Sequence, residues 1–144
     1  WGLDFSTPAR GLAVWATLLE IGADGMRERV IRHNDCARRV ADRARASDEL
    51  ELLREPVLSI CCFRYRPAGW GAGGGPDAAD EARLDALNEE ILHAVRARGR
   101  CVTSSTRVGG RFAIRPCYVN PRAGLADADA LVDEVLVVGR SLAR

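Results

Sequence analysis

Lysine is absent from this sequence. All 21 basic residues are arginines, and with 20 acidic residues they give a formal net charge of +1. Without a lysine amine, no side chain of the chain can form a Schiff base with a carbonyl compound. A net charge this close to zero also argues against a large phosphate-binding surface. We therefore expect no nucleic-acid partner and no covalently held carbonyl cofactor.

Histidine is scarce, and the cysteines lack the spacing of metal sites. There are only two histidines, and no pair of cysteines is separated by two residues. The number of cysteines is odd, and two of them are adjacent, so a disulfide framework is not indicated. We expect no metal site, and we expect buried free thiols in a reducing cytoplasm. The cysteines are Cys36, Cys61, Cys62, Cys101 and Cys117.

Long apolar runs are also missing, so that no membrane segment or signal peptide is visible and no membrane partner is expected. The chain begins at Trp1 rather than at a methionine, and we expect it to be a piece of a longer protein. What is present suffices for a folded domain, because 47% of the 144 residues are hydrophobic.

The apolar residues recur with the periods of helices and strands. A first helix is expected from Pro8 to an exit at Gly22. Further helices are expected over 24–46, 79–98 and 125–142. Strands are expected over 50–53 and 58–65, separated by Glu55–Pro56, and over 101–106 and 111–119. This order predicts an α+β fold with about four strands in an antiparallel or mixed sheet and helices on one face.

Two stretches invite a functional interpretation. Residues 69–74 spell GxGxxG, but prolines flank a long loose segment, which favours a surface loop over a dinucleotide turn. In the strand "RFAIRPCYV", alternation places Arg115 on a face that is otherwise small and apolar. A buried guanidinium keeps its proton and needs an anion, either a carboxylate side chain or a ligand. The composition and the spacing of residues indicate no more specific function.

Four pieces of the sequence, in order, resemble one family. "TPARGLAVWATLLEIGADGMRERVIRH" (7–33) has Arg10 and Trp15 in an Arg-x-Leu-x-x-Trp arrangement, and "LSICCFRYRP" follows. "RCVTSSTRVGG" and "RFAIRPCYVNPRAGLADADALVDEV" complete the match, with Arg115, Asn120 and Pro121 in register. The chain is similar to the C-terminal small domain of group II pyridoxal-phosphate-dependent decarboxylases, the relatives of aromatic amino-acid, glutamate and histidine decarboxylases.

The resemblance implies a fragment of a cytoplasmic, homodimeric lyase that decarboxylates an amino acid. Residues 1–23 would be the interdomain helix and the end of a large domain, and residues 24–144 the small domain. The large domain would bind pyridoxal phosphate and supply the Schiff-base lysine, so this chain would hold no catalytic or cofactor-binding residue and be inactive alone. Arg10 and Trp15 would serve the contact between domains.

The resemblance also gives Arg115 a candidate role. An arginine at its place lies near the substrate carboxylate in the family, and Ser104 and Ser105 would line the same cleft. The structural alternative is a salt bridge from Arg115 to an acidic residue such as Asp4. Two other functions stay open: a free-standing α+β module that binds a carboxylate ligand for regulation, and a fragment of an aminotransferase-type or aldehyde-forming relative.

Overall fold

The computed structural model describes residues 9–70 and 77–144. Within the chain two compact units are distinguished, Trp1–Ile31 and Arg32–Arg144. Helix α1 (Arg10–Arg45) contributes to both units. It is interrupted at Gly22, whose φ of 68° lies in the left-handed region that favours glycine. The prediction that one helix ends at Gly22 and another follows is confirmed. Pro8, which was expected in the first helical turn, and residues 71–74 of the GxGxxG stretch lie outside the described residues.

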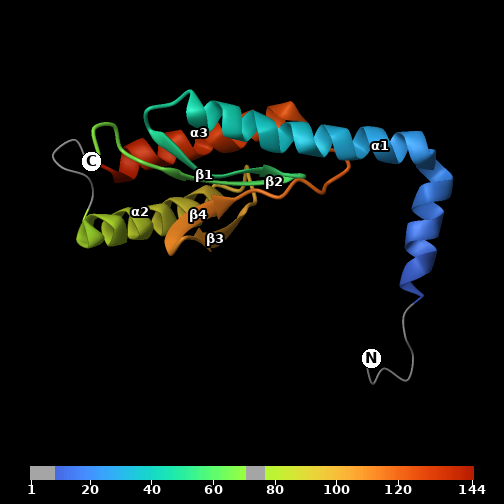
Figure 1. Cartoon of the computed structure of the whole chain (residues 1–144), viewed down its shortest axis with the longest axis horizontal. Coiled ribbons are helices and arrows are strands. Elements are labelled where there is room, and N and C mark those ends of the chain that lie inside the picture. The colour runs from blue at the N-terminus through green and yellow to red at the C-terminus, as the bar shows by residue number, and fades with distance from the viewer. Residues whose placement is uncertain (1–8, 71–76) are drawn as a thin grey trace, which may run out of the picture. The chain divides into compact units, whose positions relative to one another are not determined.

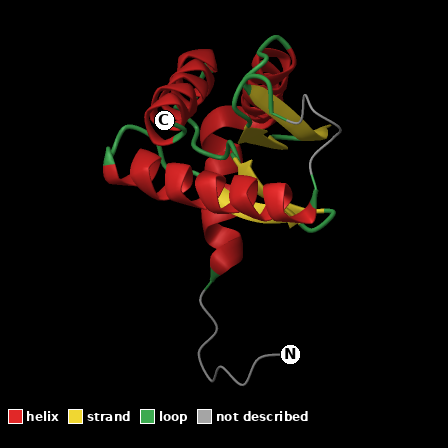
Figure 2. Cartoon of the chain, turned by 90° about the vertical axis from the view of Figure 1, so that its left-hand side faces the viewer, coloured by secondary structure: helices red, strands yellow, loops and turns green. Residues whose placement is uncertain are grey.

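The second unit contains one antiparallel sheet and the helices that cover it (Figures 1 and 2). Its strands lie in the order β1-β2-β4-β3, and every pair of neighbours is antiparallel. The α+β class and the four-stranded sheet are therefore confirmed. After α1 the elements are β1 (Leu50–Val57), β2 (Ile60–Tyr65), α2 (Ala78–Ala97), β3 (Ser104–Val108), β4 (Arg111–Arg115) and α3 (Leu125–Leu142).

The hydrophobic core lies between one face of this sheet and the three helices. Phe63 of β2 and Ile114 of β4 pair across the sheet and are completely buried. Against them pack apolar side chains from the second half of α1, from α2 and from α3, which fixes the helices on that face. The helical members of the core include Cys36, Val40, Ile91, Val95, Val132 and Val135.

Two turns explain where the strands change direction. Between β3 and β4, Gly109 and Gly110 both have positive φ, 57° and 83°, as a two-residue hairpin turn requires. Between β1 and β2 the turn falls at Leu58, with φ of 53°. The prediction that Glu55–Pro56 separate the strands was wrong: β1 continues to Val57. Because β1 is an edge strand, the missing N–H of Pro56 is tolerated there.

The two later strands are shorter than their sequence patterns indicated. β3 begins only at Ser104, not at Cys101. β4 ends at Arg115 instead of Val119, because Pro116 has no N–H to continue the ladder. A single bridge from Cys117 to Ile60 keeps the chain beside β2 after that point.

Asn88 of helix α2 forms hydrogen bonds with the backbone of β2. The Oδ1 atom of Asn88 accepts from the backbone N–H of Tyr65 at 2.7 Å, and its Nδ2 atom donates to the Tyr65 carbonyl at 2.8 Å. The side chain of Asn88 is completely buried. It therefore satisfies two backbone groups of the strand as a neighbouring strand would.

Candidate functional site

The face of the sheet opposite the Phe63 and Ile114 side chains carries most of the charged strand residues, and we call it the open face. Residues that are paired directly across antiparallel strands lie on the same face. Glu51 is paired with Arg64, Arg54 with Cys62, and Ser104 with Arg115. The alternation along β4 adds Arg111 and Ala113. The open face includes Glu51, Arg54, Cys62, Arg64, Ser104, Thr106, Val108, Arg111, Ala113 and Arg115.

Arg115 and Ser104 form a small clamp on the open face. The Nε atom of Arg115 donates to Ser104 Oγ at 3.2 Å, and that hydroxyl donates in turn to the Arg115 carbonyl at 2.8 Å. The hydroxyl thus fixes one side of the guanidinium. In the described part of the chain, neither terminal nitrogen of Arg115 has a hydrogen bond or an ion pair. Those two nitrogens are the ones that can bind a carboxylate side by side.

The exposure of Arg115 corrects one expectation. Its side chain is half-buried, not buried. On the same face Ala113 is completely buried, whereas Cys117 and Val119, beyond the end of the strand, are exposed. The salt-bridge alternative cannot be followed to Asp4, which lies outside the described residues.

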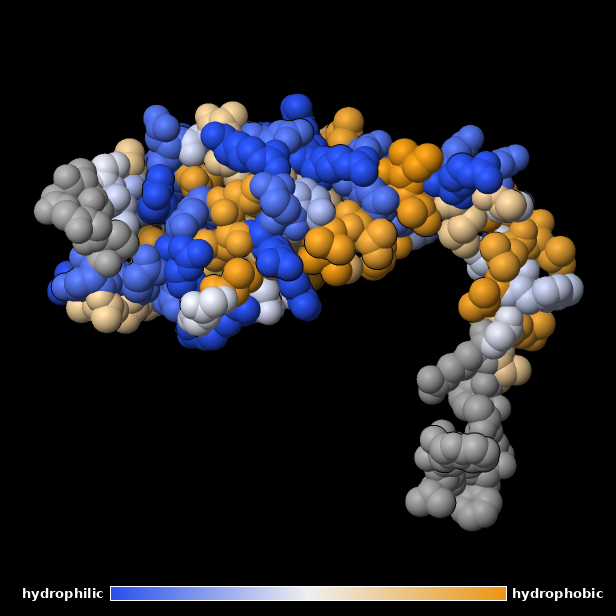
Figure 3. All heavy atoms as spheres, viewed as in Figure 1, coloured by the Kyte–Doolittle hydropathy of each residue, from blue (hydrophilic) through white to orange (hydrophobic). Residues whose placement is uncertain are grey.

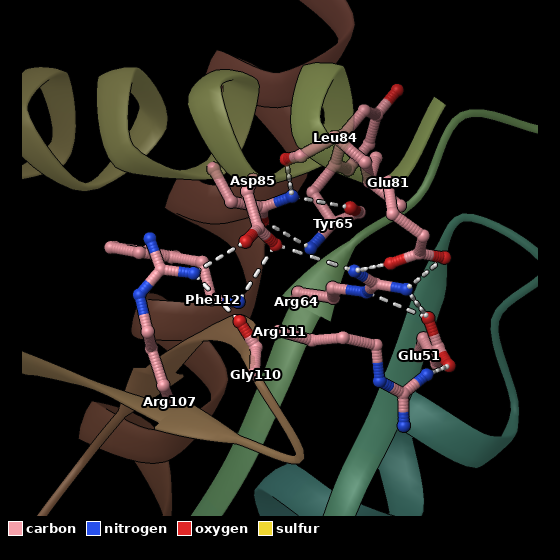
Figure 4. A network of polar contacts seen from close by, with 11 residues as sticks. Glu51, Arg64, Tyr65, Glu81, Leu84, Asp85, Arg107, Gly110, Arg111 and Phe112 are labelled. Carbon is pink, nitrogen blue, oxygen red and sulfur yellow. Dashed lines mark hydrogen bonds and ion pairs between the residues drawn. The ribbon is translucent and has the colours of Figure 1, made fainter. Parts of the chain in front are cut away.

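The buried arginine of the open face is Arg64, which the sequence analysis did not single out. Only 2% of its side chain is exposed, and it is held by carboxylates from β1 and from α2 (Figure 4). Its Nε donates to Glu51 at 2.7 Å, and its terminal nitrogens donate to the two Glu81 oxygens at 2.8 and 3.2 Å. The Arg64 guanidinium holds the pKa of Glu81 below its usual range. This arginine is part of the scaffold.

The same network extends to the end of β4. Arg111 donates to Glu51 at 2.8 Å. Asp85 of α2 accepts from Arg107 at 2.7 Å and from the backbone N–H of Phe112 at 2.7 Å (Figure 4). The network therefore ties α2 to β1, β2 and β4. The signal in the sequence was the alternation Cys62-x-Arg64 in a strand rich in apolar residues, which is the same signal as that of Arg115.

Cys62 lies between two arginines on the open face. Its partners across the sheet are Arg54 on β1 and, by the register of β2 with β4, Arg115. Burial raises the pKa of the Cys62 thiol, and the charges of Arg115 and Arg54 act in the opposite direction. A buried thiol of raised pKa remains protonated, so Cys62 is not an activated nucleophile.

The other site residues are placed apart from Arg115. Ser105 is paired with Ile114 and so belongs to the opposite face, where it is exposed at the edge of the sheet. Trp15 lies on α1 in the first unit, with 58% of its surface exposed. Arg10 is the first residue of that helix, and its side chain lies outside what the structure describes. The structure thus brings together Arg115 and Ser104.

The thiols are free, as expected, but they are not all buried. Cys36, Cys61 and Cys62 are buried, Cys101 is partly buried, and Cys117 is exposed, so the expectation was wrong for Cys117. Burial raises the pKa of Cys61 to about 12. Among the described residues, no cluster of three or more His, Cys, Asp or Glu side chains could hold a metal ion. None of the helices described is both long and apolar enough to cross a membrane.

Comparison with known proteins finds amino-acid decarboxylases that are similar in sequence. Tryptophan decarboxylase 1 from Oryza sativa subsp. japonica is 30% identical over 106 residues, which are 74% of this chain and 20% of that protein. Acidic amino acid decarboxylase GADL1 from Homo sapiens is 25% identical over 130 residues, which are 89% of this chain and 25% of that protein. No family model matches.

A solved structure of a decarboxylase domain is also similar to this chain. The glutamate decarboxylase domain of diaminobutyrate-pyruvate transaminase and L-2,4-diaminobutyrate decarboxylase from Vibrio parahaemolyticus matches with a TM-score of 0.69 and 26% identity. The match covers 89% of this chain and 25% of that one. The chain thus spans about a fifth to a quarter of the length of these relatives. The chain is similar to a C-terminal part of the group II pyridoxal-phosphate-dependent amino-acid decarboxylases.

Proposed function

We propose that this chain is the small domain of a lyase that decarboxylates an amino acid, and that Arg115 binds the carboxylate of the substrate. The observation that supports this role is the clamp described above. Ser104 accepts from the Nε of the guanidinium, and both terminal nitrogens are without a partner among the described residues. Ser104 is the residue that orients Arg115. Ser105, on the other face, stays a prediction.

An arginine contributes direction as well as charge at such a position. Two parallel hydrogen bonds to a carboxylate fix the plane of that group, which a lysine ammonium does not do. In decarboxylation the bond to the carboxylate must be aligned with the group that receives its electrons, so a fixed carboxylate plane favours reaction. The contribution of this chain to catalysis is therefore the orientation of the substrate.

The residues of this chain do not fit a complete pyridoxal phosphate site, because the chain has no lysine for the covalent link. The cofactor would be held by other parts of the parent protein, and no step of the reaction is assigned here to it. Dimerisation of the parent and its cytoplasmic location belong to the same proposal.

We also propose that the helix of the first unit contacts the large domain of the parent. Its apolar side chains are exposed and gather on this helix (Figure 3). Trp15 is 58% exposed and Leu19 66%. Exposed apolar patches of this kind mark interfaces. Arg10 would brace the same contact.

The test is kinetics and thermal unfolding of the full-length parent with Arg115 replaced. We expect Arg115→Lys to lower kcat/KM clearly and Arg115→Ala to lower it by about 30- to 1000-fold, as the loss of about 2–4 kcal/mol of charge-assisted binding implies. Cofactor absorbance and the melting temperature should stay close to those of the parent. Arg83→Lys is the matched control, because Arg83 is 78% exposed on α2. Normal kinetics with a lowered melting temperature would assign Arg115 to the scaffold instead.

A further inference from the structure

Two arginines of the open face lack a carboxylate partner in the described part of the chain. Arg64 and Arg111 are neutralised by Glu51 and Glu81. Arg115 has only the Ser104 hydroxyl, and Arg54 forms no hydrogen bond or ion pair with a described residue. The positive charge of the open face is therefore concentrated on Arg54 and Arg115.

These two arginines lie in one row across the sheet. Arg54 is opposite Cys62, and the register of β2 with β4 places Arg115 on the other side of the same cysteine. With strands about 4.8 Å apart, the backbones of Arg54 and Arg115 are separated by about 10 Å. The side chain between them is a small, protonated thiol, so no long or charged group of β2 separates the two guanidiniums.

The proposed function uses only one of these charges. A substrate with a neutral side chain offers one carboxylate, which Arg115 would bind, and it would leave Arg54 without an anion. A substrate with a second acidic group could neutralise both. The length and flexibility of two arginine side chains allow them to converge over Cys62 on a short diacid.

On the basis of the proposed function, we infer that Arg54 binds an acidic side chain of the substrate and that the parent enzyme acts on acidic amino acids in preference to neutral ones. Similarity to known proteins does not decide this choice, because the similar proteins include a tryptophan decarboxylase and an acidic amino acid decarboxylase. The pairing of Arg54 with Cys62, and of Cys62 with Arg115, supplies the discriminating feature.

The experiment measures the activity of the full-length parent on acidic amino acids and on their amides. Glutamate is compared with glutamine, and aspartate with asparagine. The quantity measured is the ratio of kcat/KM for acid over amide. We expect the parent to favour one acid, Arg54→Gln to lower that ratio by about 10- to 100-fold, and Arg54→Glu to lower it further. Arg83→Gln, an exposed arginine on α2, should leave the ratio unchanged. Melting temperatures of the variants confirm that each one is folded.

The possible failures are distinguishable. If no amino acid is decarboxylated by the parent, the proposed function is wrong. If the parent decarboxylates amino acids but prefers the amides or another neutral amino acid such as tryptophan, or if Arg54→Gln leaves the ratio of acid to amide unchanged, the role of Arg54 is refuted and that of Arg115 stands. Arg115→Ala provides the comparison, because it should lower kcat/KM for acid and amide together.

Discussion

Replacing Arg64 by leucine should strongly destabilise the second unit. Arg64 is the only charged residue at the centre of the open face that is almost fully buried, with 2% of its side chain exposed. Leucine fills part of the same space with an apolar side chain but removes the guanidinium. The carboxylates of Glu51, Glu81 and Asp85 then keep only the ion pairs and hydrogen bonds that they form with other residues.

The loss in free energy of unfolding depends on which partners each carboxylate retains. Glu51 keeps its ion pair with Arg111 at 2.8 Å. Asp85 keeps Arg107 at 2.7 Å. Glu81 has no hydrogen-bonding partner other than Arg64 among the described residues, and its side chain is only 28% exposed. Leaving one carboxylate partly buried and unpaired costs about 3 kcal/mol, at the low end for a broken buried pair because water still reaches Glu81.

Urea unfolding at pH 7, followed by circular dichroism, measures this loss. A decrease of about 3 kcal/mol lowers the urea midpoint by about 1–2 M for a domain of this size. The double variant Arg64→Leu with Glu81→Leu should recover part of the stability, because it removes the stranded charge. A loss below about 1 kcal/mol, or a double variant no better than the single one, would refute the assignment of Arg64 to the scaffold.

Two further predictions concern close packing and pH. A Cβ atom at Gly139 would lie 2.6 Å from ring atoms of Tyr65, so Gly139→Ala should lower the free energy of unfolding by about 1–2 kcal/mol despite the better helix propensity of alanine. Gly11→Ala is the control, since nothing lies within 4 Å of its added Cβ; equal effects at both sites would contradict the packing argument. Neighbouring arginines hold the pKa values of Glu81 and Glu134 below the usual 4.5, so their stabilising contribution is complete above about pH 5 and is lost as the pH falls through the lowered values. A melting temperature that stays constant from pH 6 to pH 3 would show that these pairs do not stabilise the fold.

The sequence by itself determined the elements whose signals are local. The ends of α2 and α3 were predicted to within a residue, because apolar spacing and the flanking residues define a helix without reference to distant parts of the chain. The turn at Gly109–Gly110 was predicted for the same reason, since consecutive positive φ values favour glycine. The end of β1 was not, because Pro56 is compatible with an edge strand and the order of strands is not a local property.

Only the tertiary structure decided which arginine is buried and which is free. Arg64 and Arg115 occupy equivalent positions in their strand patterns, each next to apolar residues and each on the open face. The difference arises because α2 brings Glu81 and Asp85 to Arg64, while Arg115 lies farther along the sheet beside Cys62 and Ser104. Burial and charge pairing depend on these contacts between distant segments, and no periodicity within a strand encodes them.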